Sequence, residues 1–308
     1  MKQSLYLLIL VFSFSQTQAQ QTSRIAQAAE EFGSDNPAAL SIEEILYRGA
    51  NLSLRLRNQW WDFQTTGYPQ TQSIAWLDNR AANSHYGATL IADKIGETRQ
   101  YGLAARYART LADGLKLGGS AGIFSQRIYG ENLDVFDPND PLLQVVGETR
   151  WRMSVSAGVF YSSSGYNQAW KWFAGAALRR AFFTGRLPGA TKSSAETDLL
   201  AQGGLGKKGW WIASRLRLSL EQPSAFDLYV RKYVPGERFY LGAIATTDQK
   251  RQTAGIQAGG IFQLKKAGGK NDHFLTVNLG FSKPLSKYVY GSQLIFDAHV
   301  AWTWQKEE

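Results

Sequence analysis

The sequence predicts an all-β fold, a transmembrane antiparallel up-and-down β-barrel of about 14 strands, with about 12 as the alternative. Apolar and polar residues alternate along segments of about ten residues, the length of a tilted strand that crosses a bilayer. Aromatic residues make up 13% of the chain and there are 30 glycines. Beyond the N-terminal 20 residues, no apolar run is long enough for a transmembrane helix. Together these observations favour a barrel that crosses the membrane with strands.

Period-two alternation is clearest where arginines oppose leucines. In NLSLRLRNQW (51–60), Leu52 and Leu54 share one face while Arg55 and Arg57 share the other. The same pattern recurs in RWRMSVSAGVFY, WWIASRLRLSLE, HFLTVNLGFS and QLIFDAHVAWTW. A soluble sandwich would bury the apolar face against a second sheet, whereas a membrane barrel turns it to lipid and lines its lumen with the polar face. Trp and Tyr at the segment ends, and arginines on the polar face, favour the barrel.

The alternation defines the candidate strands in order. They cover residues 51–60, 71–79, 84–92, 99–109, 115–127, 150–161, 170–180, 195–204, 209–222, 225–232, 237–245, 251–264, 271–283 and 291–304. The segments 195–204 and 225–232 alternate most weakly, which leaves about 12 strands as the alternative even number. If the N-terminus is periplasmic, the connections 61–70, 93–98 and 128–149 lie outside the cell.

The N-terminus has the pattern of a secretory signal peptide. Lys2 precedes an apolar run from Leu5 to Phe14. A polar stretch follows, with small residues at the expected cleavage position, which ends at Ala19. An apolar run of about ten residues is too short to span a membrane. We therefore expect a signal peptide at 1–19, a periplasmic N-terminal lead at 20–50 and an outer-membrane β-barrel at 51–308.

The composition and the remaining motifs argue against several kinds of site. The chain has no cysteine, so an exported protein of this sequence forms no disulfide and has no cysteine chemistry. The net charge of +9 comes with no nucleic-acid-binding motif. GLGKKG (204–209) fits the spacing of a dinucleotide-binding loop, but an alternating strand follows it instead of a helix, so a hairpin turn is predicted. We expect no cofactor.

Polar residues on the inward face predict pairing within the lumen. Asp297 and His299 lie on one face of the last strand, but no nucleophile elbow accompanies them, so a lumen hydrogen-bond network is predicted instead of a catalytic triad. Seven arginines are expected to face the lumen and to pair with carboxylates there. They are Arg55, Arg57, Arg106, Arg152, Arg179, Arg215 and Arg217.

Several motifs in the first half of the chain resemble the PorP/SprF family, outer-membrane components of the type IX secretion system of Bacteroidetes-type bacteria. They are Asn36-Pro37-Ala38, Tyr47-Arg48, RNQWWDF (57–63), YPQTQS (68–73), ADKIGETRQ (92–100) and LDVFDPNDP (133–141). The second half resembles the family only in its strand pattern. The chain also ends in Gln305-Lys306-Glu307-Glu308 instead of at the aromatic residue that usually closes such barrels.

The resemblance implies a non-enzymatic protein of the cell outer membrane that serves protein secretion and gliding motility. Its implied partners are the periplasmic ring and motor subunits of the secretion system and the C-terminal domains of secreted cargo. The alternative is an outer-membrane channel or hydrophobic-solute transporter. The family motifs mark candidate partner-binding residues: Asn36, Pro37, Arg57, Asn58, Gln59, Trp60, Pro69, Thr71, Asp93, Lys94, Gly96, Asp137, Pro138, Asn139, Asp140 and Pro141.

The stretch DPNDP (137–141) predicts a rigid outer loop. Each proline fixes its own φ and restricts the residue before it, and each Asp can form an Asx-turn. Calcium binding is the alternative, but two Asp and one Asn fall short of the six or more oxygens that Ca²⁺ takes, and the acidic-loop pattern is absent. We expect the loop to hold one shape for a partner.

Overall fold

The computed structural model describes residues 35–39, 50–59, 70–78, 83–95, 98–129, 149–163, 170–183, 195–220, 224–234, 239–248, 252–266, 271–285 and 295–306. Nearly all of these residues form antiparallel strands. The strands are β1 (Ala50–Gln59), β2 (Gln70–Asp78), β3 (Ser84–Ile95), β4 (Thr98–Ala112), β5 (Leu115–Ile128), β6 (Thr149–Ser162), β7 (Lys171–Phe183), β8 (Ala195–Lys207), β9 (Trp210–Ser219), β10 (Ala225–Tyr233), β11 (Phe239–Asp248), β12 (Gln252–Lys266), β13 (Asn271–Pro284) and β14 (Ile295–Lys306).

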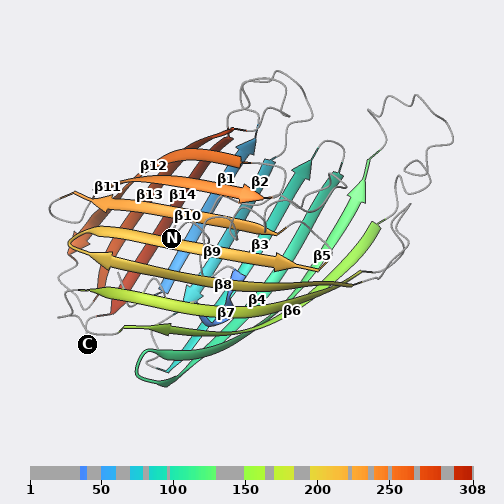
Figure 1. Cartoon of the computed structure of the whole chain (residues 1–308), viewed down its shortest axis with the longest axis horizontal. Helices are drawn as coiled ribbons and strands as arrows, with labels where there is room; N and C mark the ends of the chain where they lie inside the picture. The colour runs from blue at the N-terminus through green and yellow to red at the C-terminus, as the bar shows by residue number, and fades with distance from the viewer. Residues whose placement is uncertain are drawn as a thin grey trace, which may run out of the picture.

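The strands close into one barrel. Each pairs with its neighbour in sequence, and β1 closes the ring on β14 from Ala50↔Trp304 to Gln59↔Ile295 (Figure 1). The 14 strands confirm the predicted fold class and exclude the alternative of 12. Closure leaves no unpaired edge, which a strand protein needs in lipid because no water is available there to satisfy backbone groups.

The two weakly alternating segments both form strands, β8 and β10. In β10 the inward face carries Ala225, Tyr229 and Tyr233, all buried, while Val230 points outward. Apolar and aromatic residues therefore occupy both faces, which explains the weak alternation in the sequence. β10 pairs with β9 on one side and with β11 on the other along nearly its whole length.

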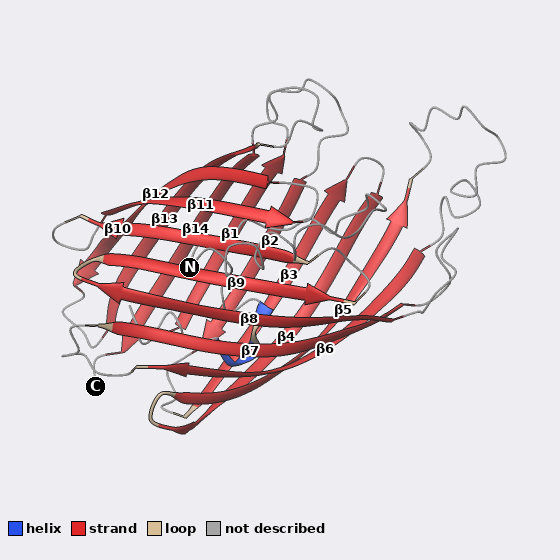
Figure 2. Cartoon of the chain, viewed as in Figure 1, coloured by secondary structure: helices blue, strands red, loops and turns tan. Residues whose placement is uncertain are grey.

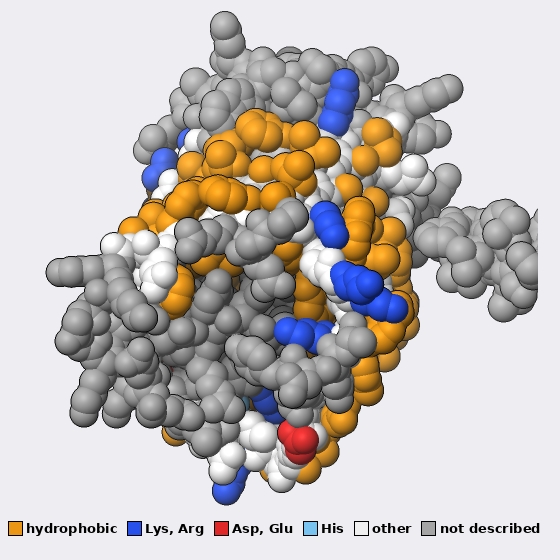
Figure 3. Space-filling view, turned by 90° about the vertical axis from the view of Figure 1, so that its left-hand side faces the viewer, with side chains coloured by type: hydrophobic (Ala, Val, Ile, Leu, Met, Phe, Trp, Pro, Cys, Tyr) orange, Lys and Arg blue, Asp and Glu red, His pale blue; other side chains and the backbone are white. Residues whose placement is uncertain are grey.

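The alternation places apolar side chains outside and polar ones inside, as predicted. On the outer wall Leu54 is 55% exposed and Met153 is 57% exposed, whereas Arg57 on the inner wall is 7% exposed. Figure 3 shows the hydrophobic side chains, in orange, spread over the outer wall. Outward aromatic residues meet across strand ends, with 5.0 Å between the ring centroids of Tyr161 and Trp172. This outer face suits hydrocarbon with an aromatic belt at its border.

The two tight turns within the described residues, β4–β5 at Asp113-Gly114 and β8–β9 at Lys208-Gly209, lie at the same end of the barrel, which we call the short-turn end. The β8–β9 hairpin turns at Lys208 (φ 49°) and Gly209 (φ 77°), the two positive φ values of a type I′ turn. This confirms the hairpin predicted for GLGKKG. The four longest connections all lie at the other end, which we call the long-loop end, and they are residues 60–69, 129–148, 184–194 and 285–294.

One short helical turn lies inside the barrel. The 3₁₀ helix η2 (Pro37–Ala39) packs against β4, β5, β6 and β7 and appears in blue in Figure 2. Within the part of the chain that the structure describes, no helix is long and apolar enough to cross a membrane. The division into signal peptide (1–19), lead (20–50) and barrel (51–308) stays a prediction, because residues 1–34 and 40–49 lie outside the described residues.

Candidate functional site in the barrel lumen

The segment Asp35–Ala39 folds on itself before it meets the wall. The Asn36 side-chain oxygen accepts a hydrogen bond from the Ala38 backbone N–H at 3.0 Å, and the Asn36 carbonyl accepts one from the Ala39 N–H at 3.0 Å. Pro37 fixes φ at the start of the turn and has no N–H to satisfy. The Asn-Pro-Ala motif therefore encodes a compact turn that needs few partners of its own.

Three glycines lie in the wall beneath this turn, one each on β5, β6 and β7. Asn36 donates from Nδ2 to the Val159 carbonyl on β6 at 3.1 Å. A Cβ on Gly118 would lie 2.5 Å from the carbonyl carbon of Pro37, and one on Gly175 would lie 2.8 Å from Nδ2 of Asn36. A Cβ on Gly158 would collide with the Asn36 side-chain oxygen. Glycine in a strand often marks a close backbone approach, and three strands provide it here.

Apolar side chains complete the contact with the turn. Ala38 and Ala39 are 0% and 1% exposed and belong to one buried cluster with Phe160, Phe173 and Tyr229. The Phe160 and Phe173 rings lie 5.6 Å apart between centroids. The inner wall thus has an apolar patch on β6, β7 and β10, and the turn covers it.

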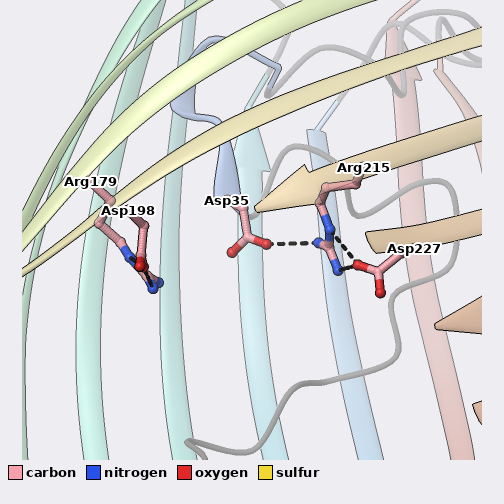
Figure 4. A network of polar contacts seen from close by, with 5 residues as sticks. All are labelled: Asp35, Arg179, Asp198, Arg215 and Asp227. Carbon is pink, nitrogen blue, oxygen red and sulfur yellow. Dashed lines mark hydrogen bonds and ion pairs between the residues drawn. The ribbon is translucent and has the colours of Figure 1, made fainter. Parts of the chain in front are cut away.

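Asp35 enters an arginine cluster next to this patch. Its Oδ2 accepts a hydrogen bond from Arg215 Nη1 at 2.7 Å, and Arg215 also donates to Asp227 from Nε at 2.8 Å (Figure 4). Arg179 forms an ion pair with Asp198 on the other side of Asp35. Arg215 therefore bridges the N-terminal segment and β10, and charge-assisted bonds of this kind are the strong ones.

The ionised form of Asp35 is favoured. Burial by the surrounding wall opposes its ionisation, but the positive charges of Arg215, Arg179, Arg217 and Arg106 outweigh this cost and hold the pKa of Asp35 below its usual range. Asp35 therefore carries a negative charge at neutral pH and interacts with these arginines as an ion. The contact persists above the ordinary carboxyl pKa and weakens as the pH falls below it.

Three of the family-motif residues form a second group, the β1–β3 row. Arg57, Thr71 and Asp93 come from three motifs but pair in register, Arg57↔Thr71 and Thr71↔Asp93. Thr71 donates from Oγ1 to Asp93 Oδ1 at 2.8 Å, and Arg57 lies opposite Asp297 with 3.7 Å between Nε and Oδ1. The row lines the inner wall toward the long-loop end.

A third group surrounds His299. The Asn278 side-chain amide lies 3.0 Å from His299 Nδ1, and the Tyr240 hydroxyl donates to Asn278 Oδ1. The Arg231 guanidinium carbon sits 3.8 Å from the centroid of the Tyr240 ring. Together with the Arg57–Asp297 pair, these contacts confirm that Asp297 and His299 belong to lumen networks.

The predicted arginine pairing is confirmed at four positions. Arg57, Arg152, Arg179 and Arg215 each form an ion pair with a carboxylate on the inner wall or in the docked segment. Arg215 also forms an ion pair with Asp35, a partner that the sequence did not indicate. Paired charges are what a partly dehydrated lumen requires, because an unpaired buried charge is costly.

Of the remaining candidate partner-binding residues from the family motifs, only Asn58, Gln59 and Lys94 lie within the described residues. Asn58 and Gln59 are in β1, and Lys94 falls on the outward face near the end of β3. Trp60, Pro69, Gly96, Asp137, Pro138, Asn139, Asp140 and Pro141 lie outside the described residues. Among the residues that the structure does describe, His, Asp and Glu form no group of three or more that could hold a metal ion.

Sequence reasoning did not identify Asp35, Arg231 or the glycines beneath the turn. Gly118, Gly158 and Gly175 stand at inward positions of alternating strands, which is the one signal that could have marked them. Asp35 is adjacent to the Asn-Pro-Ala motif, but nothing local shows that a cation 180 residues away binds it.

Many solved structures resemble the fold, among them a hydrocarbon channel and a toluene transporter. The CymD monoaromatic hydrocarbon channel matches with a TM-score of 0.52 at 12% identity, covering 91% of this chain and 94% of that chain. The Ralstonia pickettii toluene transporter TbuX matches with a TM-score of 0.51 at 13% identity, covering the same shares, 91% and 94%. At these identities the likeness shows the barrel fold. No curated protein matches the sequence.

The family comparison covers most of the chain. Residues 17–208 match the family described as "Type IX secretion system membrane protein PorP/SprF", which includes every motif that carried the resemblance. This is a family of membrane proteins and not of enzymes. Its description and the closed barrel with an apolar outer face locate the protein in the outer membrane. The chain belongs to the PorP/SprF family of type IX secretion system membrane proteins.

Proposed function

We propose that this barrel is a docking component of the type IX secretion system, which engages secreted cargo or joins the periplasmic secretion and gliding machinery to the outer membrane. Family membership gives the system. The observation that supports docking is the occupied inner wall, where Asp35–Ala39 is seated and the arginines are paired. A barrel whose inner wall binds a segment of its own chain is better suited to attaching partners than to letting solutes diffuse through it.

The second candidate is an outer-membrane channel or hydrophobic-solute transporter. It is favoured by the fold likeness to proteins named as a hydrocarbon channel and a toluene transporter. Single-channel recording separates a docking barrel from an open diffusion channel. The full chain in a planar bilayer should show little steady conductance if it is a docking barrel, and a stable open level if it is a diffusion channel.

Co-purification tests the docking function directly. The tagged protein is extracted gently from native outer membranes, and the bound chains are identified and quantified. Periplasmic ring subunits or C-terminal domains of secreted cargo should be enriched over an unrelated outer-membrane barrel isolated in the same way. Recovery of neither class would contradict the proposed function.

The orientation of the barrel can be tested with the first thiols in the protein. Cysteine is absent from the chain, so Asn139→Cys and Lys207→Cys each introduce one label site. A membrane-impermeant maleimide on whole cells is expected to label position 139, in the longest connection, and to spare position 207 beside the β8–β9 turn. The reverse pattern would show that the long-loop end faces the periplasm.

The rigid loop is expected to matter for partner binding. Changing Pro138 and Pro141 together to Ala frees φ at two positions, a change of about 0.4–1 kcal/mol each. This is too little to unfold a closed barrel, so the protein level in the outer membrane should stay normal. Secretion of cargo should fall, because ordering a mobile segment weakens binding. Normal secretion, measured by cargo in the culture medium, would show that the loop shape is not used.

A further inference from the structure

We propose that the outer wall of the barrel binds the phosphate groups of lipopolysaccharide through a row of three cations on β3, β4 and β5 at the long-loop end. The row consists of Lys94, Arg99 and Arg127, and we call it the basic row. The ligand is a phosphate-bearing glycolipid of the outer leaflet. This interaction lies outside the lumen, and it does not depend on whether the barrel docks partners or conducts solutes.

Strand register places the three cations side by side. Lys94 pairs with Arg99, and Arg99 pairs with Arg127. Residues directly opposite on neighbouring antiparallel strands have Cβ atoms about 4.5–5.5 Å apart, and like charges in that relation are destabilising. Arg99 and Arg127 are exposed on the outer wall. An anion that contacts all three side chains would relieve this repulsion.

The basic row lies at the border of the apolar outer wall. On β4 the next outward position toward the barrel centre is Tyr101, 54% exposed, and the one after it is Leu103, 49% exposed. In the same register the outer face of β6 has Trp151 and then Met153. Exposed Tyr and Trp mark the level of the lipid headgroups. The basic row is one step further from the barrel centre, about 7 Å along the strand, and is therefore at the level of lipid phosphates.

A single aromatic ring contacts both arginines. The guanidinium carbon of Arg99 lies 4.5 Å from the centroid of the Tyr129 ring, and that of Arg127 lies 5.2 Å from it. A cation–π contact positions a guanidinium without using a hydrogen bond. The N–H fork of each arginine, which matches the geometry of phosphate oxygens, is therefore left for a ligand.

The basic row differs from the lumen arginines in its surroundings. Lumen arginines are paired with carboxylates of the chain itself, as Arg215 is with Asp227. Among the residues that the structure describes, no carboxylate forms an ion pair with a member of the basic row. At the membrane border the lipid phosphates are already concentrated at the level of the row. A free phosphate ion would have to bind from water, where salt screens exposed charges. These surroundings favour the lipid as the ligand.

A matched pair of variants tests the site. Arg99→Gln removes the central charge of the basic row. Arg109→Gln removes one exposed cation from the outer face of the same strand, where its cross-strand partners are Ser84 and Leu117. Each full chain is purified in detergent and titrated with diphosphoryl lipid A, and native mass spectrometry gives the dissociation constant. Heat-modifiable gel migration shows whether each variant has assembled.

The dissociation constant for diphosphoryl lipid A is expected to rise about fivefold in Arg99→Gln and about 30-fold when Arg127→Gln is added, because each cation near a charged lipid surface adds to the attraction. Arg109→Gln should bind as the unchanged chain does. The unchanged chain should bind dephosphorylated lipid A much more weakly, and it should lose affinity for the diphosphoryl form as the salt concentration is raised.

Equal losses in Arg99→Gln and Arg109→Gln would overturn the site. Equal binding of phosphorylated and dephosphorylated lipid A by the unchanged chain would do the same, and this reading needs no variant to assemble. Displacement of lipid A by an equal concentration of inorganic phosphate would assign the row to the free ion instead. If the double variant keeps its lipopolysaccharide in native-membrane preparations but loses a bound protein, the row is a protein contact and the lipid assignment is wrong. Whole-cell labelling of position 207 but not of position 139 would place the basic row in the periplasmic leaflet and exclude lipopolysaccharide as its ligand.

Discussion

Replacing Arg215 with Leu is expected to cause a severe loss of assembled barrel. Arg215 is 8% exposed and is the shared cation of Asp227 and Asp35. Its removal leaves the buried Asp227 carboxylate without its ion pair, and breaking a buried pair in this way costs about 3–5 kcal/mol. The free energy of unfolding is measured by urea titration of the protein in lipid vesicles. The folded fraction is read from its heat-modifiable migration on a gel.

Two variants make this result specific to the ion pair. Arg217→Leu removes an arginine from the same face of β9. Among the described residues no ion pair of Arg217 is found, so its effect should be much smaller. Arg215→Leu combined with Asp227→Leu should recover most of the lost stability, because an apolar replacement of a whole buried pair is often neutral. Equal losses in Arg215→Leu and Arg217→Leu would contradict the assigned role of Arg215.

A charge on the lipid face should have a comparably large effect. Leu54 lies in the middle of β1, is 55% exposed, and sits between Ile74 and Val300 on the neighbouring strands, which are also exposed. In a soluble protein Leu54→Arg would be harmless. In a membrane barrel it places a cation at the centre of the bilayer, at a cost of about 2–4 kcal/mol. The free energy of unfolding in vesicles should fall by this amount.

Leu220→Arg is the matched control for this prediction. Leu220 follows the end of β9 and is 84% exposed, so a cation there should cost only about 0–1 kcal/mol, as near the membrane border. Equal tolerance of Leu54→Arg and Leu220→Arg would show that the outer wall at Leu54 does not face hydrocarbon.

The strands and their faces could be predicted from the sequence because both depend on local order. Period-two alternation requires only that successive side chains point to opposite sides. It therefore predicted β1, with Leu54 outside and Arg57 inside, and it predicted the β8–β9 hairpin at Lys208-Gly209. The pairing of lumen arginines with carboxylates followed from the cost of burying unpaired charge. None of these conclusions requires knowing which residues meet across the lumen.

Which residues meet across the lumen was decided only by the tertiary structure. Arg57, Thr71 and Asp93 form a row because β1, β2 and β3 pair in one particular register, which no single segment encodes. Asn36 reaches Val159 across 123 positions of sequence, and Asp35 reaches Arg215 in the same way. Such contacts arise when closure of the sheet brings β6 and β9 around one interior space, so they follow from the shape of the whole ring and not from the pattern of any strand.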